Sequence, residues 1–129
     1  MPKISMEHTQ PTDHGPVVEW ADKFGDQTVN IVEFKLDMDH TDILKGLPDD
    51  RCQCPHWGYI LRGSVTFAYA DGEETFSAGD AFYTPPGHVP IRNEPGTQYL
   101  QFSPTHALDE TEAVIMKNLA AMQAGAAPA

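Results

Sequence analysis

Short alternations of apolar and polar residues, separated by glycine and proline, run through most of the chain and predict β-strands. In residues 28–38, Val29 and Ile31 point to one face of the predicted strand and Phe34 points to the other. This single change of phase predicts either a bulge or a sheet that is buried on both faces. Further strands are predicted at residues 56–62, 65–70, 81–84 and 98–103.

Turn signals separate these strands. The Asp71-Gly72 pair is the strongest hairpin signal in the chain. Other turns are predicted at Gly63-Ser64, at 78–80, at Pro85-Pro86-Gly87 and at 94–96. Many short strands at even spacing predict an all-β fold, an antiparallel sandwich or barrel.

The pattern changes near residue 107. Residues 107–124 have helical spacing, with an apolar stripe formed by Val114, Ile115, Leu119 and Met122. We expect one C-terminal helix that caps the barrel or packs on a partner. The predicted organisation is a flexible N-terminal arm (1–17), a β-barrel (18–106), this helix (107–124) and a disordered tail (125–129).

The length of the chain indicates the number of domains, and its charge indicates which partners are excluded. The 129 residues are enough for one domain, and 19 acidic against 8 basic residues give a formal net charge of −11. The sequence has no Lys/Arg cluster of the kind that binds phosphate backbones, so we expect neither nucleic acid nor anionic membrane as a partner. The first 15 residues lack the apolar core of a signal peptide, and we expect a cytoplasmic location.

The two cysteines are candidates for metal binding. Cys52 and Cys54 are too close in sequence to stabilise the fold as a disulfide, so in a reducing compartment they are metal ligands or buried thiols. In an extended segment, Cys52, Cys54 and His56 point the same way, unless Pro55 bends the chain. His88, after the proline turn, can supply a further ligand from across the barrel.

These residues also carry a family resemblance. The run from Cys52 to Gly63, the Asp71-Gly72 turn, and Gly79-Asp80 followed by Pro85-Pro86-Gly87-His88 are similar to the two motifs of the cupin superfamily. The similarity extends from near Cys52 to about Asn93. It implies a small cupin-like jelly-roll β-barrel, often dimeric, that holds a metal inside.

The resemblance changes the expected ligands. Counting back from Gly63 places His56 where the first motif has Glu and Cys52 where it has its second His. In the second motif the expected His position is occupied by Pro90, and His88 stands two places earlier. The pattern is similar to a subset of small cupins that keep a Cys, this His and a Pro-Pro-Gly-His turn. It implies Cys52, His56 and His88 as a set, with Cys54 as a fourth candidate.

Ligand softness indicates the metal. Thiolate and imidazole favour zinc, with nickel or iron(II) as the next choices. Three protein ligands leave an open coordination position, whereas four close the site. The alternative is a barrel that has lost its ion, because cysteine is often merely buried and histidine often merely hydrogen-bonded.

The phase of the strand at 56–62 predicts its surroundings. With His56 inward, Gly58 shares its face and leaves room for a ligand. Trp57, Tyr59 and Leu61 then face outward as an apolar patch, and we expect a homodimer to cover it. Candidates for orienting a ligand are Arg62, Tyr83, Arg92, Tyr99 and Gln101.

Two functions are consistent with these features. The first is a small enzyme that uses a divalent metal, zinc before nickel or iron(II), as a Lewis acid on a small organic molecule, in an isomerase, cyclase or lyase type of reaction. The second is a non-catalytic cupin that binds or senses a small molecule, with a structural metal or none.

Overall fold

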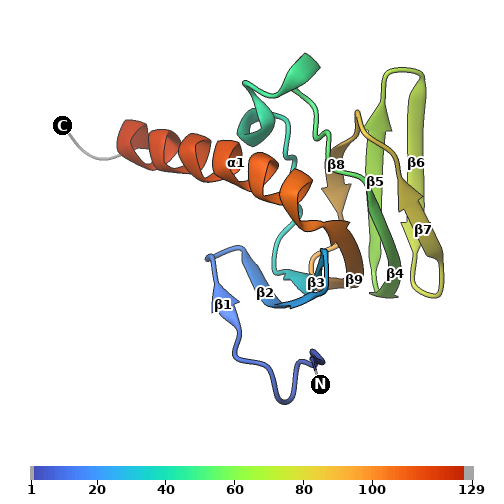
Figure 1. Ribbon diagram of the computed structural model, residues 1–129. Helices are drawn as coiled ribbons and strands as arrows, with labels where there is room; N and C mark the ends of the chain where they lie inside the picture. Colours follow the sequence, from blue (N-terminus) through green and yellow to red (C-terminus); the bar gives the residue numbers. More distant parts are fainter. Residues whose placement is uncertain (1, 127–129) are drawn as a thin grey trace.

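Two antiparallel sheets and one helix make up the protein in a computed structural model, which describes residues 2–126 and side chains as far as residue 122 (Figure 1). The strands are β1 (Thr12–Asp13), β2 (Val17–Phe24), β3 (Gln27–Phe34), β4 (His56–Arg62), β5 (Ser64–Tyr69), β6 (Gly72–Ser77), β7 (Ala81–Thr84), β8 (Val89–Asn93) and β9 (Thr97–Pro104). Two short 3₁₀ helices, η1 (Asp42–Leu44) and η2 (Pro48–Asp50), lie between β3 and β4. The chain continues from β9 into α1 (Thr105–Ala126).

The strand order brings distant parts of the sequence together. The larger sheet has the order β1-β2-β3-β9-β4-β7 and the smaller one β6-β5-β8. Strand β9 therefore pairs with both β3 and β4, which are separated by more than twenty residues of loop and 3₁₀ helix. This arrangement places the start of β4 beside the last residues of β9.

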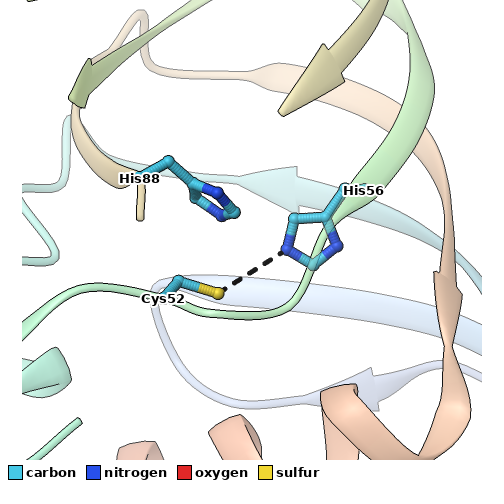
Figure 2. A group of neighbouring side chains, drawn as sticks. All are labelled: Cys52, His56 and His88. Carbon is cyan, nitrogen blue, oxygen red and sulfur yellow. Dashed lines mark hydrogen bonds between the residues drawn. The ribbon is translucent and has the colours of Figure 1, made fainter. Parts of the chain in front are cut away.

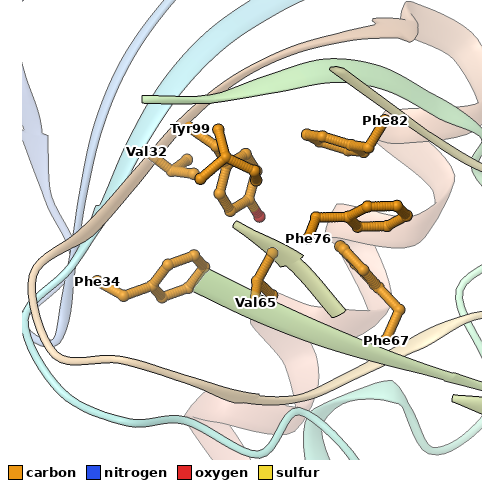
Figure 3. Close-up of a cluster of buried hydrophobic side chains, with 8 residues drawn as sticks. Val32, Phe34, Val65, Phe67, Phe76, Phe82 and Tyr99 are labelled. Atoms are coloured by element: carbon orange, nitrogen blue, oxygen red, sulfur yellow. The ribbon is translucent and has the colours of Figure 1, made fainter. Parts of the chain in front are cut away.

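The space between the sheets is filled mainly by aromatic and β-branched side chains (Figure 3). This core consists of Val32, Phe34, Ile60, Val65, Phe67, Phe76, Phe82 and Tyr99, which come from both sheets. Val29 and Ile31, on the opposite face of β3, are also buried. The phase change in this strand therefore reflects burial on both faces, one of the two predicted readings.

The predicted strands at 56–62 and 81–84 match β4 and β7. Strands β1, β2, β6 and β8 were not predicted as strands, although the Asp71-Gly72 signal did predict the turn between β5 and β6. Strand β8 carries Pro90 at its second position, and a proline lowers any strand signal. The segment expected to be a flexible arm contains β1, which pairs with β2.

Helix α1 contains the predicted helical range and is longer at both ends. It projects away from the sheets after leaving β9 (Figure 1). The amide of Asn118 anchors it to the η1 region by donating to the carbonyl oxygens of Ile43 and Lys45, at 2.7 and 2.8 Å. Of the predicted disordered tail, residues 125 and 126 belong to the helix and residues 127–129 lie outside the described part of the chain. No helix in the described residues is both long and apolar enough to cross a membrane.

Candidate metal centre

Three of the four predicted ligands converge inside the fold. Cys52, His56 and His88 each offer one ligand atom, and these atoms all lie within 4.8 Å of one another. Figure 2 shows the sulfur of Cys52 and the two imidazole rings directed toward a shared point. The three residues are only 5%, 6% and 1% exposed, so a group bound between them is shielded from water.

Backbone pairing holds Cys52 and His88 side by side. The two residues form an antiparallel bridge, in which the Cys52 N–H donates to the His88 carbonyl oxygen at 2.9 Å. The N–H of Gly87 donates to the Cys52 carbonyl oxygen at 2.8 Å. Gly87 has a φ of +97°, a conformation that glycine adopts without strain, and this turns the chain after the two prolines.

His56 reaches the same point from the first position of β4, where it pairs with Thr84 of β7. Its Nδ1 lies 2.7 Å from Ser103 Oγ at the end of β9, and its Nε2 lies 3.9 Å from Cys52 Sγ. Ser103 is completely buried, so the contact fixes the orientation of the ring. Metal-binding histidines commonly have such a partner on the nitrogen that does not bind the metal.

His88 is oriented in the same manner. Its Nδ1 lies 2.8 Å from the Pro85 carbonyl oxygen. Because a carbonyl oxygen only accepts hydrogen bonds, Nδ1 carries the proton and Nε2 keeps a free lone pair. Nδ1 is thus occupied in both rings, which leaves Nε2 of each as the nitrogen available to a metal.

Burial sets the protonation of the three groups. It lowers the pKa of His56 to about 3, aided by the neighbouring His88, and it also lowers the pKa of His88. Burial raises the pKa of the Cys52 thiol. In the metal-free protein near neutral pH, both imidazoles are thus neutral ligands and the thiol holds a proton that metal binding releases.

The donor set fits a divalent metal ion. In tetrahedral zinc sites with one thiolate and two imidazoles, the ligand atoms lie about 3.4 to 3.6 Å apart. The Cys52 Sγ to His56 Nε2 distance of 3.9 Å approaches this spacing. All three ligand atoms lie within 4.8 Å of one another, so metal binding requires them to move closer together.

Cys54 lies outside this group. Its side chain is fully buried, and its Sγ is 4.0 Å from Nδ1 of His56, the nitrogen opposite to the one that faces Cys52. Cys52, Cys54 and His56 were predicted on one face of an extended segment unless Pro55 bends the chain, and residues 53–55 are not part of a strand. Burial raises the pKa of the Cys54 thiol to about 12, which keeps it protonated.

A cavity of about 600 Å³ adjoins the three residues. Its walls are largely apolar and come from both sheets, η1 and α1. The polar side chains that line it, besides the three candidate ligands, are His14, Glu19, Asn30, His40, Tyr99, Gln101, Thr111 and Glu112. A volume of this size is typical of small-molecule sites.

The prediction that Gly58 leaves room for a ligand is wrong. A Cβ at this position would collide with the Leu100 carbonyl oxygen and the Phe82 ring, so the space beside Gly58 is occupied by the core. Glycine is required there for close packing of β4 against its neighbours.

The candidate orienting residues separate into two groups. Tyr99 and Gln101 are buried and line the cavity. Tyr83 is 48% exposed and stacks on Trp57 outside it. Arg92 forms an exposed ion pair with Glu73 at 2.9 Å, the ordinary surface role. Arg62 is also exposed and bonds to the Gly96 carbonyl oxygen at 3.1 Å.

Sequence reasoning missed several residues of the site. Ser103 shares the inward face of β9 with Tyr99 and Gln101, and the period of two in that strand could have indicated it. Glu19, Asn30 and His40 lie in segments whose inward face depends on pairing partners far along the chain.

Comparisons with known proteins support the fold. No protein-family model matches the sequence, and no curated protein sequence matches it. The structure is similar to that of KdgF from Halomonas sp. (18% identity, 81% of this chain and 94% of that chain, TM-score 0.58). It is similar to a sugar phosphate isomerase from a cupin superfamily of Silicibacter pomeroyi DSS-3 (13% identity, 80% and 75%, TM-score 0.55). An RmlC-like cupin from Shewanella frigidimarina NCIMB 400 is also similar (18% identity, 78% and 87%, TM-score 0.51). These likenesses confirm the predicted fold class.

Proposed function

We propose that this protein, whose fold is the cupin jelly roll, is a small metal-dependent enzyme that acts on a small organic molecule by Lewis-acid chemistry. Cys52, His56 and His88 hold the divalent ion. The observation that carries the proposal is the convergence of these three buried side chains beside a cavity of about 600 Å³. One of the similar structures is described as a sugar phosphate isomerase, which fits the expected isomerase, cyclase or lyase type of reaction.

Zinc is the preferred ion. One thiolate and two imidazoles match its preference for sulfur and nitrogen, whereas iron and manganese oxygen chemistry uses imidazole and carboxylate ligands. A thiolate beside activated oxygen is also prone to oxidation. Nickel and iron(II) are the second choices.

The bound ion supplies polarisation of a substrate carbonyl or of a water in the open coordination position. The chain supplies hydrogen-bonding groups. Burial raises the pKa of the Tyr99 phenol well above its usual range, so Tyr99 keeps its proton and can donate a hydrogen bond to a substrate oxygen. Burial lowers the pKa of His40 to about 4, so its ring is neutral near pH 7 and can hydrogen-bond a substrate. Both residues line the cavity.

One observation favours the second function, a non-catalytic binding cupin. Cys52 Sγ is within sulfur hydrogen-bond distance of His56 Nε2, and His88 bonds to Pro85. Cys52 and His56 are therefore satisfied without an ion, and of the three side chains only His88 keeps a free lone pair, which is compatible with a barrel that binds a ligand with a structural metal or none.

Elemental analysis of protein purified without an affinity tag tests the metal. We expect about one zinc per chain, lost in Cys52→Ser and retained in the matched variant Cys54→Ser. Cobalt(II) substitution then tests the open position, because addition of azide changes the cobalt spectrum only when a coordination position is free. A folded protein that takes up no divalent ion contradicts the enzyme, and a cobalt spectrum unaffected by azide favours a structural metal.

The outer face of β4 and β7 supports a homodimer. Trp57, Tyr59, Leu61 and Tyr83 are each more than 40% exposed. The rings of Trp57 and Tyr83 stack with their centroids 5.1 Å apart, which forms a rigid aromatic surface. The patch lies at the edge of the larger sheet, where β7 has a neighbour on one side only. A second copy that covers this patch removes large apolar side chains from water.

A further inference from the structure

A group of hydrogen-bond acceptors lines the cavity beside the candidate metal centre. Asn30 of β3 and Gln101 of β9 stand directly opposite each other in the sheet, and both line the cavity. They are 3% and 7% exposed. Asn30 Oδ1 and Gln101 Oε1 are both buried without a hydrogen-bond partner. Buried polar atoms are normally paired, so these two unpaired amide atoms indicate a missing hydrogen-bond partner.

The orientation of Asn30 identifies its free atom as an acceptor. Asn30 Nδ2 donates to Glu19 Oε2 at 2.7 Å. Because a carboxylate only accepts hydrogen bonds, the amide cannot be turned round, and the unpaired atom is the oxygen. A donor on a bound molecule can therefore satisfy it.

Negative charge reinforces this preference. Glu19 and Glu112 both line the cavity, and the described residues that line it include no Lys or Arg. Burial raises the pKa of Glu112, and the negative charge of Glu19 contributes to the shift. Glu19 has a histidine beside it in the lining, His14, whose Nε2 is 3.5 Å from Glu19 Oε1. An anion placed here meets the carboxyl groups of Glu19 and Glu112 and the Asn30 oxygen, and like charges repel.

We infer that Glu19, Asn30, Gln101 and Glu112 form an acceptor wall that binds a hydrogen-bond-donating group of the ligand, a hydroxyl or an ammonium, and rejects carboxylate and phosphate groups. The inference rests on the proposed function in one respect, that the ligand occupies the cavity beside the metal. The substrate is then neutral or cationic at the end that meets the acceptor wall. Its carbonyl or other metal-binding group lies at the other end.

Hydroxamates that differ only in their terminal group test the wall. The probes carry one hydroxamate to bind zinc, a spacer of two to five methylene groups, and an ammonium, a hydroxyl, a carboxylate or a methyl at the far end. Binding to the zinc-loaded protein is measured by titration calorimetry. We expect the best ammonium and hydroxyl probes to bind at least about tenfold more tightly than the carboxylate probe of equal length. A carboxylate probe that binds as tightly as the other two overturns the inference.

Two matched glutamate variants test the assignment to the wall. Glu112→Gln is expected to weaken the ammonium probe by about tenfold and to leave the hydroxyl probe within about twofold. Glu110→Gln removes the same charge from an exposed position of the same helix and is expected to leave both unchanged. Equal effects of the two variants contradict a specific role for Glu112.

Different experimental results would contradict the metal site and the acceptor wall. If the methyl-terminated probe shows no zinc-dependent binding, the metal proposal fails. The terminal groups are then compared on the metal-free protein with 1,5-diaminopentane, 1,5-pentanediol and glutarate. The wall predicts that the diamine or the diol binds and glutarate does not. Absence of binding by all three, or binding by glutarate alone, overturns the wall.

Discussion

The imidazole rings of His56 and His88 meet edge to face inside the fold, with centroids 5.1 Å apart and an interplanar angle of 61°. Each ring has its Nδ1 beside a separate oxygen, Ser103 Oγ for His56 and the Pro85 carbonyl for His88. Two buried neutral imidazoles in such contact leave both Nε2 atoms near Cys52. The arrangement is suited to binding a cation between them and costs energy when either ring is protonated.

Replacing Cys52 is expected to abolish metal binding, whereas replacing Cys54 is not. In the cobalt(II) protein, the thiolate charge-transfer band should disappear in Cys52→Ser and persist in Cys54→Ser, because only the Cys52 sulfur faces the imidazole Nε2 atoms. Both thiols are buried, so the variants are matched in exposure. Loss of the band in Cys54→Ser alone would show that the ligand set is different.

Removing the hydroxyl of Ser103 is expected to weaken metal binding without removing a ligand. Ser103→Ala deprives His56 Nδ1 of its partner at 2.7 Å, and loss of such a partner typically costs about 10- to 100-fold in metal affinity. Competition with a chromophoric chelator measures the zinc dissociation constant. Ser77→Ala, at an exposed position of β6, serves as the control. An unchanged affinity in Ser103→Ala would mean that the ring is oriented by packing alone.

The metal-free protein is expected to lose stability as the pH falls below about 6.5. Burial lowers the pKa of His56 to about 3 and that of His40 to about 4, so between these values and 6.5 the unfolded chain binds protons that the folded chain does not. Each of the two histidines contributes a decrease of about 1.4 kcal/mol in unfolding free energy per pH unit across its window.

Urea unfolding in the presence of a chelator, at several pH values between 4.5 and 7, measures this slope. His56→Gln should reduce this slope by about 1.4 kcal/mol per pH unit, the contribution of one histidine. His106→Gln changes an exposed histidine of α1 and should leave it unchanged. A stability that does not vary over this range would contradict the neutral, buried state of the two rings.

The aromatic patch is expected to mediate self-association. Tyr59→Lys places a charge among Trp57, Leu61 and Tyr83 and should convert a dimer into a monomer, because a lysine cannot be buried there without a partner. Sedimentation equilibrium measures the molar mass. Leu36→Lys, at a position that is 60% exposed and outside the patch, is the control. A monomeric natural protein would remove the basis for the homodimer.

Local sequence was sufficient for much of the architecture. The strands at 56–62 and 81–84 were predicted at their observed bounds, because proline or glycine lies close to both ends of each. The outward direction of Trp57, Tyr59 and Leu61 also followed from the period of two. Strand β8 escaped prediction because Pro90 breaks its pattern, and β2 because it lies at the edge of a segment that looked unstructured.

The sequence by itself determined the all-β class, the C-terminal helix and the chemistry of the candidate ligands, since these depend on residue type and short-range spacing. Only the tertiary structure decided which candidates meet. By residue type Cys52 and Cys54 are equivalent, and only the family resemblance ranked Cys54 lower. In the structure, the bridge from Cys52 to His88 and the irregular backbone at 53–55 place the two thiols near opposite nitrogens of His56. Ser103 and the acceptor wall depend on pairings between strands separated by tens of residues. Such contacts arise when whole sheets pack together, and short-range sequence patterns do not predict them.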